Sequence, residues 1–186
     1  MKLFVVLMSM FSAVLWEKPS NNAESYAYSY IDTYRDVAVI EMHRSGIPAS
    51  IILAQGLLES NYGTSELSTE AHNHFGIKCK SYWQGDTFYH EDDDYDIRGK
   101  LIDSCFRKYN SSVESYVDHS NFLMYTAHYQ ELFSYDKYDY KSWAYGLKKC
   151  GYATDKRYAE KLISMIEKYE LYHYDGWDVP FRTQLK

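Results

Sequence analysis

Glu59 is the first residue whose neighbours in the sequence suggest chemistry. It follows the apolar segments 51–54 and 57–58 near the end of a predicted helix. Apolar surroundings disfavour the charged form of a carboxyl group and raise its pKa, which suits a general acid working near neutral pH. Gln55, one helical turn earlier on the same face, is a candidate to orient Glu59 or a substrate. The alternative is a structural glutamate in a helix cap or local ion pair.

A second group of carboxylates lies in residues 90–96, with the sequence His-Glu-Asp-Asp-Asp-Tyr-Asp. Hydrolysis of a glycosidic bond commonly uses two carboxyl groups, one as proton donor and one as base or nucleophile. The alternative for most of these acids is a solvated charged turn. A calcium loop is a third interpretation, because four acids fall at ligand positions of an EF-hand count: Asp92, Asp94, Asp96 and Asp103. Ile97 stands where that loop requires glycine, so we expect no metal site.

The hydrophobic spacing predicts helices on both sides of these residues. A helix over 26–44 ends at Ser45-Gly46, and Pro48 opens a second helix over 48–60. The second helix is apolar on nearly every side, which predicts that it is buried. Residues 61–76 are typical of a loop with a short helical turn, and the aromatic segments of 77–109 predict a small β-hairpin or sheet.

Helical spacing returns in the second half of the chain. Ser111 and Glu114 form a capping box at the start of one helix. Another is predicted over 138–149, and the last runs from Thr154 or Asp155 to about Tyr172. The predicted fold class is therefore mainly α, with a small β insertion, over one domain at 26–174. Residues 175–186 are expected to form a tail without a core role.

Composition and the N-terminus limit the class of protein. The formal net charge is −6, and no basic face of the kind that binds nucleic acid is visible. Lys2 precedes an apolar run over 3–15, too short to span a bilayer and typical of a secretory signal. We expect residues 1–25 to be a signal peptide and linker, cleaved between 12 and 27, and the protein to be exported. A retained N-terminal anchor is the alternative.

Other chemistries lack support in the sequence. There is no glycine-rich phosphate loop and no nucleophile elbow, and no cofactor is expected. The three cysteines are Cys79, Cys105 and Cys150. One disulfide is possible with any pairing, although free buried cysteines are the simpler expectation.

Five ordered segments resemble one known family, the bacterial endo-β-N-acetylglucosaminidases that include flagellar rod-cap hydrolases and autolysins. Residues 54–63, AQGLLESNYG, match the family's A-Q-x-x-L-E-S-x-x-G signature. The later segments are 73–78, NHFGIK; 83–85, WQG; 106–109, FRKY; and 151–162, GYATDKRYAEKL. The resemblance spans most of residues 47–166.

The resemblance implies a lysozyme-like helical domain whose cleft is flanked by a small β-lobe. It implies hydrolysis of the β-1,4 bond after N-acetylglucosamine in peptidoglycan, with Glu59 as the general acid and Tyr152 assisting. The family's second carboxylate lies between WQG and FRKY. The acid-plus-tyrosine pair there is Asp94-Tyr95, and the alternatives are Glu91, Asp92, Asp93 and Asp96.

The substrate-binding residues implied by the matched segments are Gln55, Asn73, Phe75, Trp83, Tyr95 and Tyr158. For Phe75 and Trp83, core packing is an equal alternative to sugar stacking. The expected partner is the peptidoglycan glycan strand, bound by a monomer. A muramidase, a lytic transglycosylase or a catalytically silent peptidoglycan-binding module are the competing hypotheses.

Overall fold

A computed structural model of the protein describes residues 22–95 and 98–179, with side chains for all of these except 93–95. Residues 1–21 of the predicted signal peptide and linker lie outside the described residues, whereas 22–25, predicted as linker, form the start of the first helix. Within them, no helix combines the length and apolar character that crossing a membrane would require.

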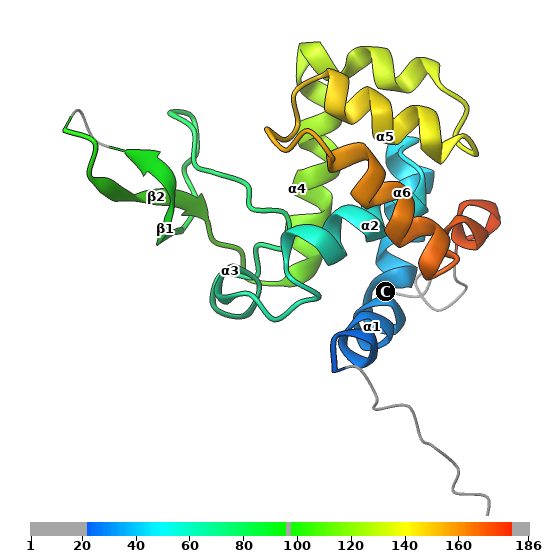
Figure 1. The fold of residues 1–186 in the computed structure, drawn as a ribbon, viewed down its shortest axis with the longest axis horizontal. Coiled ribbons are helices and arrows are strands. Elements are labelled where there is room, and N and C mark those ends of the chain that lie inside the picture. The colour runs from blue at the N-terminus through cyan, green and yellow to red at the C-terminus, as the bar shows by residue number, and fades with distance from the viewer. Residues whose placement is uncertain (1–21, 96–97, 180–186) are drawn as a thin grey trace, which may run out of the picture.

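The central element is α2 (Ala49–Glu59), a helix buried on all sides from Ala49 to Leu57. It packs against α1 (Asn22–Ser45), α5 (Tyr140–Lys149), α6 (Tyr158–Lys168) and the 3-10 helix η2 (Leu171–Gly176) (Figure 1). Gly56 permits the close approach to α1, because a Cβ there would stand 2.5 Å from the Tyr30 hydroxyl oxygen. The prediction of a buried second helix is confirmed.

The N-terminus of α2 is held from the far end of the chain. Pro48 precedes the helix and supplies no side-chain cap. Instead the Asp175 carboxylate accepts hydrogen bonds from the backbone N–H of Ser50 at 2.8 Å and from its hydroxyl at 2.7 Å. Asp175 is 1% exposed, so the expectation that 175–186 has no core role is wrong at this residue.

Two later helices confirm local sequence signals. α4 (Ser112–Tyr125) begins at Ser111, whose hydroxyl accepts from the Glu114 N–H. α5 begins at Asp139, which caps it through the Ser142 N–H. Between them lies the 3-10 helix η1 (Ala127–Ser134).

The last helix differs from its prediction at both ends. Asp155 accepts a hydrogen bond from the Arg157 N–H, but α6 itself begins only at Tyr158. At the other end Glu170 adopts a left-handed φ of 53°, which stops the helix and turns the chain into η2. Helical spacing alone did not reveal this break, because apolar residues continue across it.

The predicted β-hairpin is confirmed as two antiparallel strands, β1 (Thr87–Tyr95) and β2 (Leu101–Arg107). They pair from Thr87 with Arg107 to Glu91 with Asp103, and the register becomes irregular between Glu91 and Tyr95. With the short α3 (Glu66–Glu70), the hairpin forms a lobe on one side of the helical body (Figure 1). The predicted fold class, mainly α with a small β-lobe, is confirmed.

A disulfide between Cys79 and Cys105 fastens the segment before β1 to β2. The Cys79 N–H also donates to the Cys105 carbonyl at 2.8 Å. Cys150 is free. The expectation of three free cysteines is therefore wrong, because the fold brings together two residues that are 26 positions apart in the sequence.

Candidate active site

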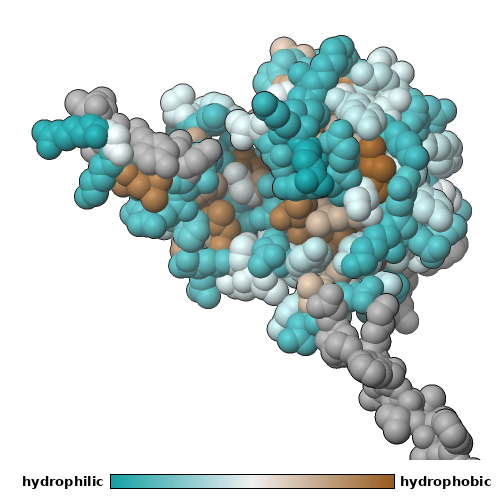
Figure 2. Space-filling model, viewed as in Figure 1, coloured by the Kyte–Doolittle hydropathy of each residue, from teal (hydrophilic) through white to brown (hydrophobic). Residues whose placement is uncertain are grey.

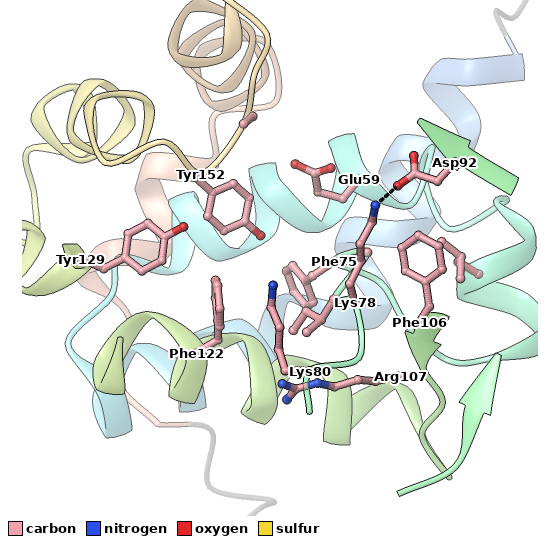
Figure 3. A pocket seen from close by; sticks show the side chains of 14 residues that line it. Glu59, Phe75, Lys78, Lys80, Asp92, Phe106, Arg107, Phe122, Tyr129 and Tyr152 are labelled. Carbon is pink, nitrogen blue, oxygen red and sulfur yellow. Dashed lines mark ion pairs between the residues drawn. The ribbon is translucent and has the colours of Figure 1, made fainter. Parts of the chain in front are cut away.

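A cleft with a cavity volume of about 420 Å³ separates the helical body from the β-lobe. Figure 2 shows the hollow between the projecting lobe and the body, with apolar residues on its inner surface. Polar and aromatic side chains from both sides line it (Figure 3): Glu59, Phe75, Lys78, Lys80, Asp92, Phe106, Arg107, Phe122, Tyr129 and Tyr152.

Glu59 is the last residue of α2 and lies on the wall of this cleft. The Tyr158 hydroxyl donates to its Oε1 at 2.9 Å, and the Gln55 side-chain amide donates to the Tyr158 oxygen at 3.0 Å. Gln55 and Tyr158 are buried behind the cleft. Gln55 therefore reaches Glu59 only through Tyr158, and the predicted roles of Gln55 and Tyr158 stay predictions.

The pKa of Glu59 is raised above its ordinary value because the carboxyl group is buried. The hydrogen bond from Tyr158 and the positive charge of Lys161 oppose this shift without cancelling it. Burial therefore favours the protonated form, which is the form a general acid must hold before it reacts.

Tyr152 lies in the loop that follows α5 and lines the cleft together with Glu59 (Figure 3). Gly151 turns the chain with a φ of 78°, and the Tyr152 N–H then returns to the Leu147 carbonyl at 3.0 Å. The Tyr152 ring stacks on Tyr158, with centroids 5.6 Å apart. Burial raises the pKa of Tyr152, so its phenol stays neutral and can donate a hydrogen bond into the cleft.

The acid that β1 directs into the described cleft is Asp92. It lines the cavity and forms an ion pair with Lys78 at 2.7 Å (Figure 3). The side chains of Asp94 and Tyr95 lie outside the described part of the chain, so their predicted roles stay predictions. In the same described part, no cluster of three or more His, Cys, Asp or Glu side chains is arranged to hold a metal ion.

Phe75 forms part of the cleft surface. It is 4% exposed and stacks on His119 with centroids 4.0 Å apart. Phe75 is therefore packed in the core at the cleft wall, and its stacking on a sugar stays a prediction.

The side chain of Asn73 is hydrogen-bonded to backbone groups of the protein. Its amide nitrogen donates to the carbonyls of Ile77 and Arg107, and its amide oxygen accepts from the Ile77 N–H at 3.0 Å. These bonds engage both ends of a buried side chain. Asn73 therefore joins the loop before the lobe to β2 and does not line the cleft.

Trp83 also lies away from Glu59. Its indole N–H donates to the Asp86 carbonyl at 2.9 Å, and the Arg107 guanidinium stands 4.7 Å from its ring centre. It lines a separate hollow with Tyr109 and α4 residues, and its predicted sugar stacking stays a prediction.

The fold adds cleft residues that the sequence did not single out as site residues. Lys78 belonged to the segment 73–78 and was detectable by its place in that motif. Lys80, Phe122 and Tyr129 carry no local signal, because only the packing of the lobe and α4 against the body brings them to the cleft.

Comparison with known proteins agrees with this architecture. The glucosaminidase family model, described as mannosyl-glycoprotein endo-beta-N-acetylglucosaminidase, matches residues 35–171. The chain is 35% identical over 150 residues to the exo-glucosaminidase LytG of Bacillus subtilis, covering 78% of this chain and 52% of LytG.

Two solved structures share the fold. The catalytic domain of the autolysin Auto from Listeria monocytogenes superposes with a TM-score of 0.68 at 29% identity, over 87% of this chain and 92% of that domain. The glycoside hydrolase domain of Salmonella typhimurium FlgJ gives 0.63 at 28% identity, over 77% of this chain and 88% of that domain. The chain spans about half the length of LytG. Because the family model covers most of the chain, the chain belongs to the glucosaminidase family.

Proposed function

We propose that the protein is a peptidoglycan hydrolase that cuts the β-1,4 bond after N-acetylglucosamine. The observation that carries this proposal is the carboxyl group of Glu59, held by Tyr158 on the wall of the cleft with a raised pKa. Relatives named glucosaminidase and glycoside hydrolase support the reaction class.

In the proposed reaction Glu59 protonates the leaving glycosidic oxygen, and water completes the hydrolysis of the sugar. The neutral phenol of Tyr152 donates a hydrogen bond to the N-acetyl group or to the sugar bound beside Glu59. The positively charged centre that develops is stabilised by a β1 carboxylate or by the substrate's own N-acetyl group. Asp92 is our candidate for that carboxylate because it lines the cleft, and Asp94 is the alternative that the motif predicts.

The test is digestion of purified peptidoglycan, with the fragments reduced and identified by mass spectrometry. Wild type is expected to produce N-acetylglucosaminitol ends, and Glu59→Gln to lose about 10² to 10⁴ of the rate, because proton donation by a positioned acid contributes that much. Asp92→Asn is expected to lose less than Glu59→Gln. Glu70→Gln, an exposed glutamate of α3, is the matched control and should retain full activity.

Each competing hypothesis has its own product. Muramitol ends would identify a muramidase, and 1,6-anhydromuramic ends a lytic transglycosylase. A folded wild type that binds cell walls but releases no new ends would identify a binding module, and any of these results would contradict the proposal.

We also propose that the protein acts outside the cytoplasm, where its substrate lies. The support is the apolar run over 3–15. Sequencing the N-terminus of the exported protein checks this, since cleavage between 12 and 27 is expected. An intact Met1 in a cytoplasmic fraction would rule out the signal peptide.

A further inference from the structure

A second cavity continues from the active-site cleft, and we propose that it binds a carboxylate of the peptide stem through Lys80. This inference rests on the proposed function, since the stem is the substituent that peptidoglycan carries beside the bond to be cut. In this proposal Lys80 determines specificity for the peptide stem, whereas Glu59 acts on the glycan.

The second cavity has a volume of about 700 Å³ and shares three lining residues with the cleft: Lys80, Arg107 and Phe122. It extends from this shared wall past Tyr82 on the lobe and the end of α4 at Tyr125. Because the two cavities meet at the same side chains, a substituent on a sugar held beside Glu59 can enter the second cavity without leaving the protein surface.

The cations along this wall differ in their partners. The Arg107 guanidinium is engaged by Asp118 at 2.7 Å and by the Tyr82 hydroxyl at 3.1 Å. Lys78 is paired with Asp92. Over the residues for which the structure gives side chains, the Lys80 ammonium has neither an ion pair nor a hydrogen bond. Lys80 therefore offers the shared wall a positive charge that no described carboxylate neutralises.

Two aromatic rings that line the second cavity together with Lys80 are exposed to solvent. Tyr82 is 65% exposed and Tyr125 is 76% exposed. Tyr82 is nevertheless fixed, because the Arg107 guanidinium donates to its hydroxyl and lies 5.4 Å from its ring centre. A fixed exposed ring in the same cavity as an unpaired ammonium suits a ligand that has both an apolar part and a negative charge.

Peptidoglycan offers one such ligand on each stem. The lactyl carboxyl group of the muramic sugar is used in the amide bond to the stem, so the glycan itself presents no carboxylate there. Free carboxylates occur on the amino acids of the stem. Charge complementarity therefore assigns the stem carboxylate to Lys80, with the stem backbone lying over Tyr82 and Tyr125.

The experiment compares one peptidoglycan preparation, freed of teichoic polymers, before and after its free carboxylates are converted to carboxamides with carbodiimide and ammonium. This treatment keeps the length of the stem and removes its charge. Rates of release of reducing ends at low substrate concentration are measured for wild type, Lys80→Met, Lys80→Arg and the control Lys156→Met, an exposed lysine outside both cavities.

Wild type is expected to be about fivefold slower on the amidated substrate, as for loss of one partly exposed ion pair. Lys80→Met should be slow on both substrates by the same factor, with amidation causing no further loss. Lys80→Arg should recover most of the difference, and Lys156→Met should behave as wild type. If amidation slows Lys80→Met as much as wild type, or if Lys80→Met matches wild type on native substrate, the inference is overturned while the proposed function stands. A wild type that cuts neither substrate contradicts the proposed function itself.

Discussion

At the scale of single residues, the protonation of Glu59 depends on the hydroxyl group of Tyr158. Tyr158 is buried, receives a hydrogen bond from Gln55 and donates to Glu59. This bond stabilises the carboxylate form and lowers the pKa that burial raises. The three residues thus form a chain that sets both the direction and the proton affinity of the acid.

Replacing Tyr158 with Phe should raise the pKa of Glu59 further, because the hydrogen bond that lowers it is lost. A general acid works while protonated, so activity falls as pH rises through its pKa. The high-pH limb of the kcat/KM profile should therefore move to higher pH in Tyr158→Phe. The profile is measured by release of reducing ends between pH 4 and pH 9.

Tyr145→Phe is the matched control for this variant, because Tyr145 is exposed on α5 and lies outside the cleft. Its profile should coincide with that of wild type. If the high-pH limb of the Tyr158→Phe profile stays in place or moves to lower pH, the hydrogen bond from Tyr158 does not control the pKa of Glu59.

At the scale of elements, α2 is the helix that must hold Glu59 in place, and its two ends are held differently. The C-terminal end carries Glu59, while the N-terminal end depends on Asp175. The carboxylate satisfies the free Ser50 N–H of the first turn, as a local N-cap residue would do. These hydrogen bonds between Asp175 and Ser50 connect η2 to the buried helix α2.

Asp175→Ala should lower the free energy of unfolding by about 1–3 kcal/mol, because a buried N–H and a buried hydroxyl lose their acceptor. Urea denaturation at pH 7 measures this. Activity per folded molecule should change little, since Asp175 is not among the residues that line the cleft.

The control is Asp178→Ala, which removes an exposed carboxylate three residues later. It should leave the urea midpoint unchanged. If Asp175→Ala and wild type are equally stable, water replaces the Asp175–Ser50 hydrogen bonds without loss of stability.

At the scale of the whole molecule, the buried histidines couple the fold to pH. His119 is fully buried between Phe75 and the Tyr152 region, and neither ring nitrogen has a hydrogen-bond partner in the described part of the chain. Burial lowers its pKa to about 3, and burial first, then the charge of His72, lowers that of His74 to about 4. Both therefore remain neutral in the folded protein at pH values where the unfolded chain binds protons.

The contribution of these two histidines to stability should consequently fall as pH drops below about 6.5, the pKa of an unfolded histidine. For His119 the loss between pH 7 and pH 5 is about 2 kcal/mol by proton linkage. His119→Leu, which cannot bind a proton, should show a pH 7 to pH 5 difference smaller than that of wild type by this amount. Urea denaturation at the two pH values gives both differences.

Val113→Leu, an exposed position on the same helix α4, changes no titratable group; it is the control and should keep the wild-type pH dependence. If His119→Leu loses as much stability as wild type between pH 7 and pH 5, protonation of His119 does not contribute to the loss.

The local elements of this protein followed from local signals. The apolar run of α2, the Ser111 capping box and the aromatic hairpin segments each depend on neighbours within a few residues. The ordered motifs likewise predicted the family, because their residues keep a fixed order along the chain. The role of Glu59 as the acid stays a prediction.

Contacts between distant segments were decided only by the tertiary structure. Asp175 on Ser50, the pairing of Cys79 with Cys105, and the arrival of Asp92 and Lys80 at one cleft each join segments that no short pattern connects. Asn73 and Trp83 show the same limit, since their motifs could not distinguish packing from substrate contact. Periodicity reports which face of an element is apolar, but the partner of a polar side chain is set by the packing of whole elements, which brings distant residues within hydrogen-bond reach.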